Sequence, residues 1–108
     1  MTERTLSSDS RRLRAVLRTR SVEVAAVLDR YGAYDVKLFG SAARGDAGPQ
    51  SDIDLMVSIN APEYEQIVSM LGLTEELSQL LGLKVDVVAR GVAREGVSAS
   101  ARVDILDV

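Results

Sequence analysis

The sequence has 108 residues, of which 46% are hydrophobic and 27% charged, and its formal net charge is −3. This length and these fractions predict a single soluble domain over residues 1–108. No apolar run approaches the roughly 20 residues that cross a bilayer and the first residues lack a secretory signal, so a cytoplasmic protein without a membrane partner is expected. The chain has no Cys and no His, which excludes disulfides and thiolate or imidazole ligands and leaves a carboxylate-bound hard cation, Mg²⁺ or Mn²⁺, as the metal to expect.

The first predicted element is a helix over residues 10–31, preceded by a frayed stretch over residues 1–9. Its apolar residues recur with helical spacing, but Thr19-Arg20-Ser21 interrupts them, so either one kinked helix or two shorter helices would fit. Residues 1–30 hold seven Arg and four acidic residues, for a charge of +3, whereas residues 31–108 carry −6. The basic end could contact nucleic acid or an acidic partner, although a solvated helix face is the commoner explanation, and the sequence leaves both open.

Three strands are predicted after this helix, at residues 34–39, 53–59 and 83–89, because apolar and β-branched residues alternate there and turn residues follow. The first two strands are joined by a turn and loop of about a dozen residues, which favours antiparallel pairing. A long helix joins the second strand to the third and permits a parallel crossover. We therefore expect an α/β (α+β) fold, a small mixed sheet flanked by helices, with residues 34–90 as its core. A short terminal helix is predicted at residues 98–106.

Two acids, Asp52 and Asp54, lie at the start of the second predicted strand. Residues two apart on a strand point to the same side at about 6–7 Å from each other, so both carboxylates could bind one hard cation or a pair of cations. Like charges on a half-buried face are costly, and a bound Mg²⁺ would offset their repulsion and their lost hydration. Asp86, within the apolar third strand, could complete a two-metal site of the kind that stabilises displacement at phosphorus. Taken alone, each acid could instead cap a turn or pair with Lys84 or Arg44.

A turn with Gly40 and Ser41 follows the first predicted strand and could bind phosphate. Gly40 permits a ligand to approach the backbone closely, and Ser41, as the expected N-cap of a short helical turn, offers its hydroxyl and N–H to phosphate oxygens. Arg44 lies one turn further and could reach the same phosphates, and Ser51 belongs to the same predicted nucleotide-binding set. A Gly-Ser turn by itself is more often a plain strand-to-helix connection. The turn is not a P-loop, because Asp46 stands where that motif requires Lys.

These motifs together resemble those of a known family. Phe39-Gly40-Ser41, followed after ten residues by Asp52-Ile53-Asp54, matches a nucleotidyltransferase signature. The stretch FGSAARGDAGPQSDIDLMV, with LGLKVDVV downstream, resembles the minimal nucleotidyltransferase (MNT) family of the polymerase-β-like superfamily over about residues 12–90. The resemblance implies a nucleotidyltransferase fold that binds ATP with Mg²⁺. It implies that Asp52, Asp54 and Asp86 are metal ligands and catalytic acids, and that Gly40 and Ser41 hold the triphosphate.

Members of this family commonly act as antitoxins paired with a helical HEPN-domain toxin, an RNase, and some transfer AMP onto a toxin tyrosine. The resemblance therefore implies a Mg-dependent protein adenylyltransferase in a hetero-oligomer with a cognate HEPN toxin, in which Asp86 helps to deprotonate the tyrosine hydroxyl. Only 19 residues follow Ala89, so the acceptor is expected to bring its own binding surface. Two other functions stay open: a non-catalytic antitoxin that neutralises the toxin by binding, and a small-molecule nucleotidyltransferase similar to the aminoglycoside enzymes.

Overall fold

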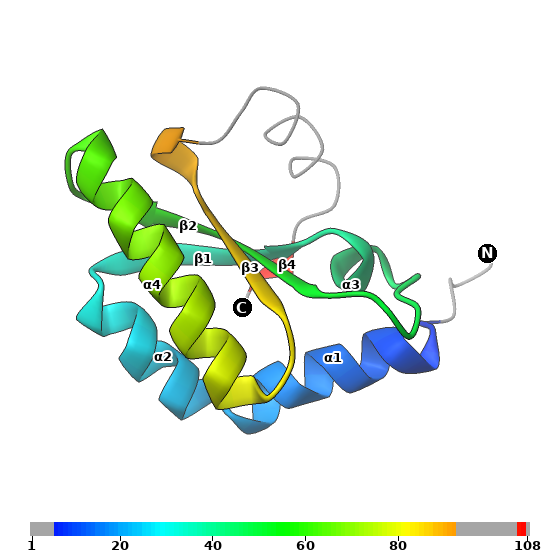
Figure 1. The fold of residues 1–108 in the computed structure, drawn as a ribbon. Coiled ribbons are helices and arrows are strands. Elements are labelled where there is room, and N and C mark those ends of the chain that lie inside the picture. Colours follow the sequence, from blue (N-terminus) through cyan, green and yellow to red (C-terminus); the bar gives the residue numbers. More distant parts are fainter. Residues whose placement is uncertain (1–5, 93–105, 108) are drawn as a thin grey trace.

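The N-terminal segment forms two helices in the computed structural model, which describes residues 6–92 and 106–107. Helix α1 spans Ser8–Thr19 and helix α2 spans Ser21–Arg30 (Figure 1). Arg20 between them has a ψ of 23°, outside the helical range, so the helix breaks at the point where the apolar stripe of the sequence is interrupted. Of the two arrangements that the sequence left open, the structure has the pair of shorter helices.

The start of α1 is fixed by Ser7. Its hydroxyl accepts a hydrogen bond from the backbone N–H of Ser10 at 3.0 Å and so caps the helix. The prediction that residues 1–9 fray is therefore wrong for residues 6–9, because Ser7 caps α1 and fixes its first turn. Residues 1–5 lie outside the part that the structure describes.

The sheet is mixed, as the lengths of the connections predicted. Its strands are β1 (Ala33–Phe39), β2 (Ile53–Ile59), β3 (Val85–Ala89) and β4 (Leu106–Asp107), in the order β3-β2-β1-β4. β1 is antiparallel to β2 and to β4, and β2 is parallel to β3. The short strand β4 was not predicted. The helix predicted at residues 98–106 lies outside the described residues except for Leu106, which belongs to β4.

Two helices connect the strands of the sheet. The short helix α3 (Ser41–Arg44) follows β1, and the long helix α4 (Glu63–Leu81) carries the chain from β2 to the parallel β3. A 3₁₀ turn, η1 (Arg90–Val92), follows β3. None of the helices in the described ranges is long and apolar enough to cross a membrane.

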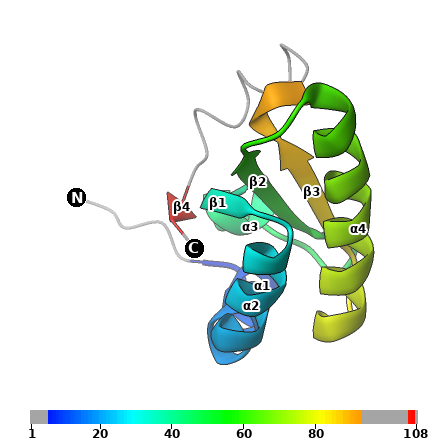
Figure 2. The same ribbon diagram turned by 90° about the vertical axis from the view of Figure 1, so that its left-hand side faces the viewer.

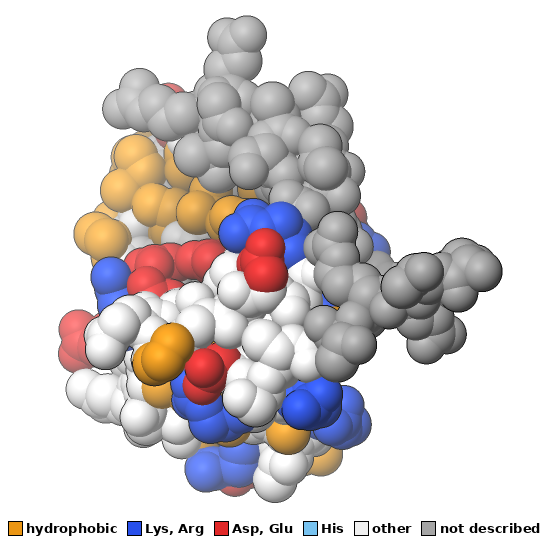
Figure 3. Space-filling model, turned by 90° about the vertical axis from the view of Figure 1, so that its right-hand side faces the viewer, with side chains coloured by type: hydrophobic (Ala, Val, Ile, Leu, Met, Phe, Trp, Pro, Cys, Tyr) orange, Lys and Arg blue, Asp and Glu red, His pale blue; other side chains and the backbone are white. Residues whose placement is uncertain are grey.

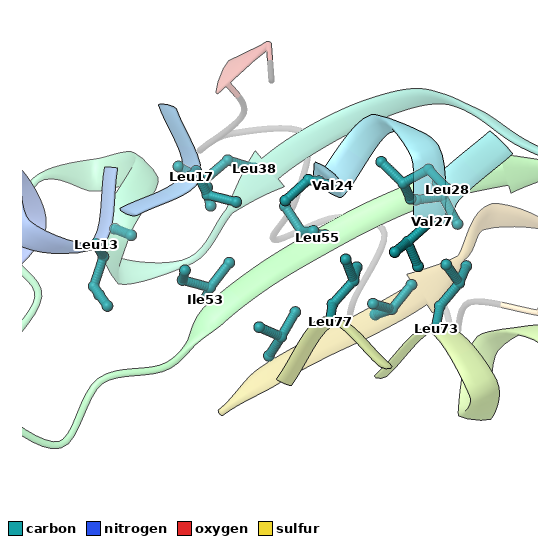
Figure 4. Close-up of a cluster of buried hydrophobic side chains, with 14 of the residues drawn as sticks. Leu13, Leu17, Val24, Val27, Leu28, Leu38, Ile53, Leu55, Leu73 and Leu77 are labelled. Carbon is teal, nitrogen blue, oxygen red and sulfur yellow. The ribbon is translucent and has the colours of Figure 1, made fainter. Parts of the chain in front are cut away.

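The hydrophobic core lies between one face of the sheet and helices α1, α2 and α4, as Figures 1 and 2 show. Alternate residues of β2 point into it, and Ile53, Leu55 and Val57 are fully buried. Figure 4 shows Ile53 and Leu55 among leucines and valines of all three helices, including Leu13 of α1 and Leu77 of α4. Since side chains alternate along a strand, the residues between them point to the other face, and this is the face that carries the acids.

Candidate active site

The turn after β1 depends on Gly40. Its backbone, at φ 78° and ψ −157°, lies in a region that is essentially restricted to glycine. A Cβ built on Gly40 would lie 3.2 Å from Cγ of Asp54 and would overlap its carboxylate oxygen Oδ2. The N-cap of α3 is Gly40, and the prediction of Ser41 in that role is wrong because the chain turns one residue earlier. Glycine thus allows this turn to pack directly on a carboxylate.

Three acids lie close to one another beside this turn. Asp54 on β2 is paired in register with Asp86 on the neighbouring strand β3, and Asp52 lies just before β2. The ammonium Nζ of Lys84 lies 3.5 Å from Oδ2 of Asp52 and 4.0 Å from Oδ2 of Asp86. The face drawn in Figure 3 shows a row of acidic side chains with basic side chains beside it. The structure therefore brings the three predicted acids together and adds a lysine that bridges two of them.

The electrostatic cost of this arrangement falls on Asp54. Its pKa is raised from 3.8 to about 6, first because the carboxyl group is partly buried, and then because the charges of Asp86 and Asp52 repel its ionised form. Lys84 and Arg44 act in the opposite direction, but they do not restore the usual pKa. The site consequently holds more negative charge than its own cations neutralise.

This donor set fits a hard divalent cation chemically. The available ligands are carboxylate oxygens, and the raised pKa of Asp54 marks an excess of negative charge that a cation would relieve. As the side chains stand, however, no group of three acids within residues 6–92 and 106–107 is arranged to hold a metal ion. Binding of a cation by all three acids would therefore require their side chains to rearrange and Lys84 to leave its position beside Asp52 and Asp86.

The other residues of the predicted nucleotide-binding set lie at the ends of the loop between α3 and β2. Arg44 pairs with Asp46, with Nε 3.3 Å from Oδ2, and its charge lowers the pKa of Asp54. Ser51 closes the loop, because its hydroxyl accepts a hydrogen bond from the N–H of Gly48 at 2.9 Å. Arg44 thus acts on Asp54 electrostatically, whereas the hydroxyl of Ser51 shapes the backbone just before Asp52.

Two residues of this region have contacts that the sequence did not reveal. From the sequence Lys84 is expected to pair with a single acid, yet it lies beside two, Asp52 and Asp86. Arg14 is one of several arginines in the N-terminal helix, and its guanidinium donates hydrogen bonds to the carbonyl groups of Ala42 and Ala43 in α3. Neither spacing nor charge pattern in the sequence signals such long-range contacts.

Comparisons with known proteins point to one family. Residues 24–107 match the family model of the nucleotidyltransferase domain. The chain is 31% identical to the protein adenylyltransferase MntA of Thermococcus cleftensis over 80 residues, which cover 74% of this chain and 79% of that protein. It is 42% identical over 62 residues to a protein of Methanocaldococcus jannaschii named as a candidate protein adenylyltransferase. That match covers 57% of this chain and 62% of the relative, so the chain spans less than two thirds of its length.

Solved structures share the fold. A structure described as a candidate minimal nucleotidyltransferase superposes with a TM-score of 0.70 at 31% identity, covering 87% of this chain and 94% of that one. A toxin–antitoxin complex with AMP-PNP gives 0.67 at 20% identity and covers 80% of this chain and 69% of its own. A tri-AMPylated Shewanella oneidensis HEPN toxin in complex with its MNT antitoxin gives 0.64 at 17% identity, covering 83% and 69%. At these last two identities the likeness concerns the fold alone.

Proposed function

Since the chain belongs to the nucleotidyltransferase domain family, as a minimal nucleotidyltransferase, we propose that it transfers AMP from ATP to a tyrosine of a cognate HEPN-domain toxin and thereby acts as its antitoxin. Relatives named as protein adenylyltransferases support the transfer of AMP to a protein. Complexes of the same fold with HEPN toxins support the kind of partner. The two proteins would form a hetero-oligomer.

The observation that carries this proposal is the contact between the Gly40 turn and Asp54. A glycine whose missing Cβ leaves room for a carboxylate places a backbone turn and an acid side by side. In register with Asp54 lies a second acid, Asp86, on the next strand. A triphosphate bound along such a turn would have its phosphorus atoms next to the acids, which is the arrangement that nucleotidyl transfer needs.

In the proposed site, one set of residues would bind the nucleotide and another set would bind the cation. Gly40, Ser41 and Arg44, with Ser51 at the end of the loop, would bind the triphosphate of ATP. Asp52, Asp54 and Asp86 would hold Mg²⁺, which supplies charge neutralisation at the phosphates when it is bound. Asp54 is then ionised, because a cation would offset the repulsion that raises its pKa in the free protein.

The proposed reaction is a single displacement at the α-phosphorus of ATP. The tyrosine oxygen of the toxin forms a bond to this phosphorus, the bond between the phosphorus and the oxygen bridging to the β-phosphate breaks, and pyrophosphate leaves. The hydroxyl proton passes to a base, for which Asp86 is the candidate because it lies on the strand beside Asp54. The product is a tyrosine phosphodiester of AMP, and the chain itself is unchanged.

Transfer of label from ATP carrying ³²P at the α-phosphate to a co-purified HEPN-domain partner tests the proposal. We expect the partner to be labelled by the wild-type chain, and the labelling to be lost in the Asp52→Asn and Asp54→Asn variants. Asp29→Asn is the matched control, because Asp29 is an exposed acid on α2. Undiminished labelling by the Asp54→Asn variant would contradict the proposed site. A variant that labels nothing yet still protects cells would show that binding alone neutralises the toxin.

A further inference from the structure

The two middle residues of the short helix α3 are hydrogen-bonded to an arginine of α1. The guanidinium of Arg14 donates from Nε to the carbonyl oxygen of Ala42 and from Nη2 to that of Ala43, both at 2.8 Å. The last carbonyl groups of a helix have no partner within the helix. The planar fork of Arg matches two adjacent acceptors. Arg14 thus satisfies two acceptors that a four-residue helix cannot satisfy itself.

Two serines, Ser7 at the N-cap of α1 and Ser10 in its first turn, hold the chain just beyond α3. The N–H of Ser7 donates to the carbonyl oxygen of Gly45 at 2.9 Å, and its hydroxyl donates to that of Ala47 at 2.7 Å. The hydroxyl of Ser10, which is fully buried, accepts a hydrogen bond from the N–H of Ala47 at 2.9 Å. Arg14, Ser7 and Ser10 together hold the backbone of residues 42–47, the segment that follows the Gly40 turn.

Arg14 differs in this respect from the arginines around it. Arg12 pairs with Asp9 at 3.1 Å and Arg20 with Glu23 at 3.0 Å, both within a few residues on the same stretch of helix. The partners of Arg14 lie 28 and 29 residues further along the chain. Side chains that pair locally at the surface contribute little to structure, whereas a fork that joins two distant segments fixes their relative position.

We propose that Arg14 is a positioning residue for the nucleotide site: by clamping α3 to α1 it sets the place of the Gly40 turn and Arg44 relative to Asp54. The inference rests on the proposed function, because it assumes that this turn binds the triphosphate. The two hydrogen bonds of Arg14 go to backbone carbonyl groups, so the proposed role needs no contact between Arg14 and the nucleotide. Its loss should therefore weaken binding of the nucleotide more than it slows the transfer of AMP by the saturated enzyme.

Titration of the full chain with AMP-PNP by calorimetry tests this inference. In Arg14→Met, which keeps the aliphatic stem but has no donors, we expect the dissociation constant to rise roughly tenfold, or ~1.4 kcal/mol. Arg14→Lys keeps the charge but can reach only one carbonyl well, so it should restore binding only in part. Arg18→Met is the matched control, because Arg18 is exposed one turn further along α1, and its dissociation constant should stay within about twofold of the wild-type value.

Two further measurements separate positioning from general damage to the fold. With the labelled-ATP assay, Arg14→Met should raise KM for ATP while kcat changes less. Amide hydrogen exchange without nucleotide should quicken at Ala43 to Ala47 but not in β2. Unchanged AMP-PNP affinity in Arg14→Met, or full restoration by Arg14→Lys, would overturn the inference. A wild-type chain that binds no AMP-PNP would overturn the proposed function and this inference with it, whereas wild-type binding with an unaffected Arg14→Met would overturn the inference alone.

Discussion

Gly40, the residue after β1, packs directly on Asp54 of β2: a Cβ on Gly40 would lie 3.2 Å from Cγ of Asp54. The strands β1 and β2 are adjacent and antiparallel, and Phe39, the residue before Gly40, is the register partner of Asp54. Glycine is needed at position 40 for two reasons: a side chain would overlap Asp54, and the positive φ of 78° would strain any other residue. The contact ties the phosphate-binding turn that we propose to the acid whose pKa is most perturbed.

We predict that Gly40→Ala is destabilising and inactive. The backbone region costs a non-glycine residue of order 1–3 kcal/mol, and the overlap with Asp54 adds to this cost or displaces the carboxylate. Urea unfolding should show the loss of stability, and the labelled-ATP assay the loss of transfer. Gly48→Ala is the control, because a Cβ there meets nothing within 4 Å, and its effect should stay within about 0.5 kcal/mol. Equal stability of the two variants would refute this account of Gly40.

The free energy of unfolding of the metal-free protein should fall as the pH rises from 4 to 7, because Asp54 ionises in this range. Its pKa is raised from 3.8 to about 6 by burial and by Asp86 and Asp52, so between these values the folded state binds more protons than the unfolded state. The free energy of unfolding then falls as the pH rises through this window, and the full cost is present above the folded pKa. Asp54→Asn removes this titration.

Comparison of Asp54→Asn with the wild type separates the titration of Asp54 from that of the other groups. The free energy of unfolding of Asp54→Asn minus that of the wild type should increase from pH 4 to pH 7 and level off above it. Urea unfolding in EDTA measures this difference, and added Mg²⁺ should reduce it by stabilising the ionised carboxylate. A difference that is flat across the window would show that Asp54 titrates normally.

Gly72 in the middle of α4 should not tolerate alanine. Gly normally costs a helix about 1 kcal/mol relative to Ala, so Gly72→Ala would be expected to stabilise an isolated helix. Here a Cβ would lie 2.8 Å from the ring atom Cε1 of Tyr31, whose hydroxyl is hydrogen-bonded to Glu76. We therefore expect Gly72→Ala to destabilise the protein by about 1–3 kcal/mol in urea unfolding.

A double variant identifies the cause of that loss. In a Tyr31→Ala background the ring is absent, so adding Gly72→Ala should be neutral or stabilising, in line with helix propensity. If Gly72→Ala were equally destabilising in both backgrounds, the contact with Tyr31 would not be its cause. The experiment also tests the packing of α2 against α4, because Tyr31 follows directly after α2.

The parts of the fold that depend on local pattern could be predicted from the sequence. Alternation along β2 gave the strand and its two faces, and the helical connection to β3 gave the parallel pairing that brings Asp54 opposite Asp86. For Gly72, which lies within α4, helix propensity gives only a cost relative to Ala. Which ring occupies the space of its missing side chain depends on how α2 packs on α4, and no periodicity encodes that.

The parts of the candidate site that depend on distant contacts could not be predicted. Arg14 stands among five arginines between residues 11 and 20, all compatible with a solvated helix face. Its role depends on the carbonyl groups of Ala42 and Ala43, which become unpaired acceptors only because α3 is four residues long. Side-chain identity gives the chemistry of a residue, whereas the crossing of two helices decides which backbone groups it meets.

Lys84 should compete with a divalent cation for the acids. Its ammonium lies 3.5 Å from a carboxylate oxygen of Asp52 and 4.0 Å from one of Asp86, so a bound cation must displace it and overcome its repulsion. We expect Lys84→Met to bind Mn²⁺ severalfold more tightly in the absence of nucleotide, as measured by the loss of the free Mn²⁺ signal in electron paramagnetic resonance. Lys37→Met is the control, because Lys37 pairs with Asp35 at 3.5 Å on β1, and its affinity should match the wild type. Weaker Mn²⁺ binding in Lys84→Met would show instead that the lysine holds the carboxylates in the arrangement the cation needs.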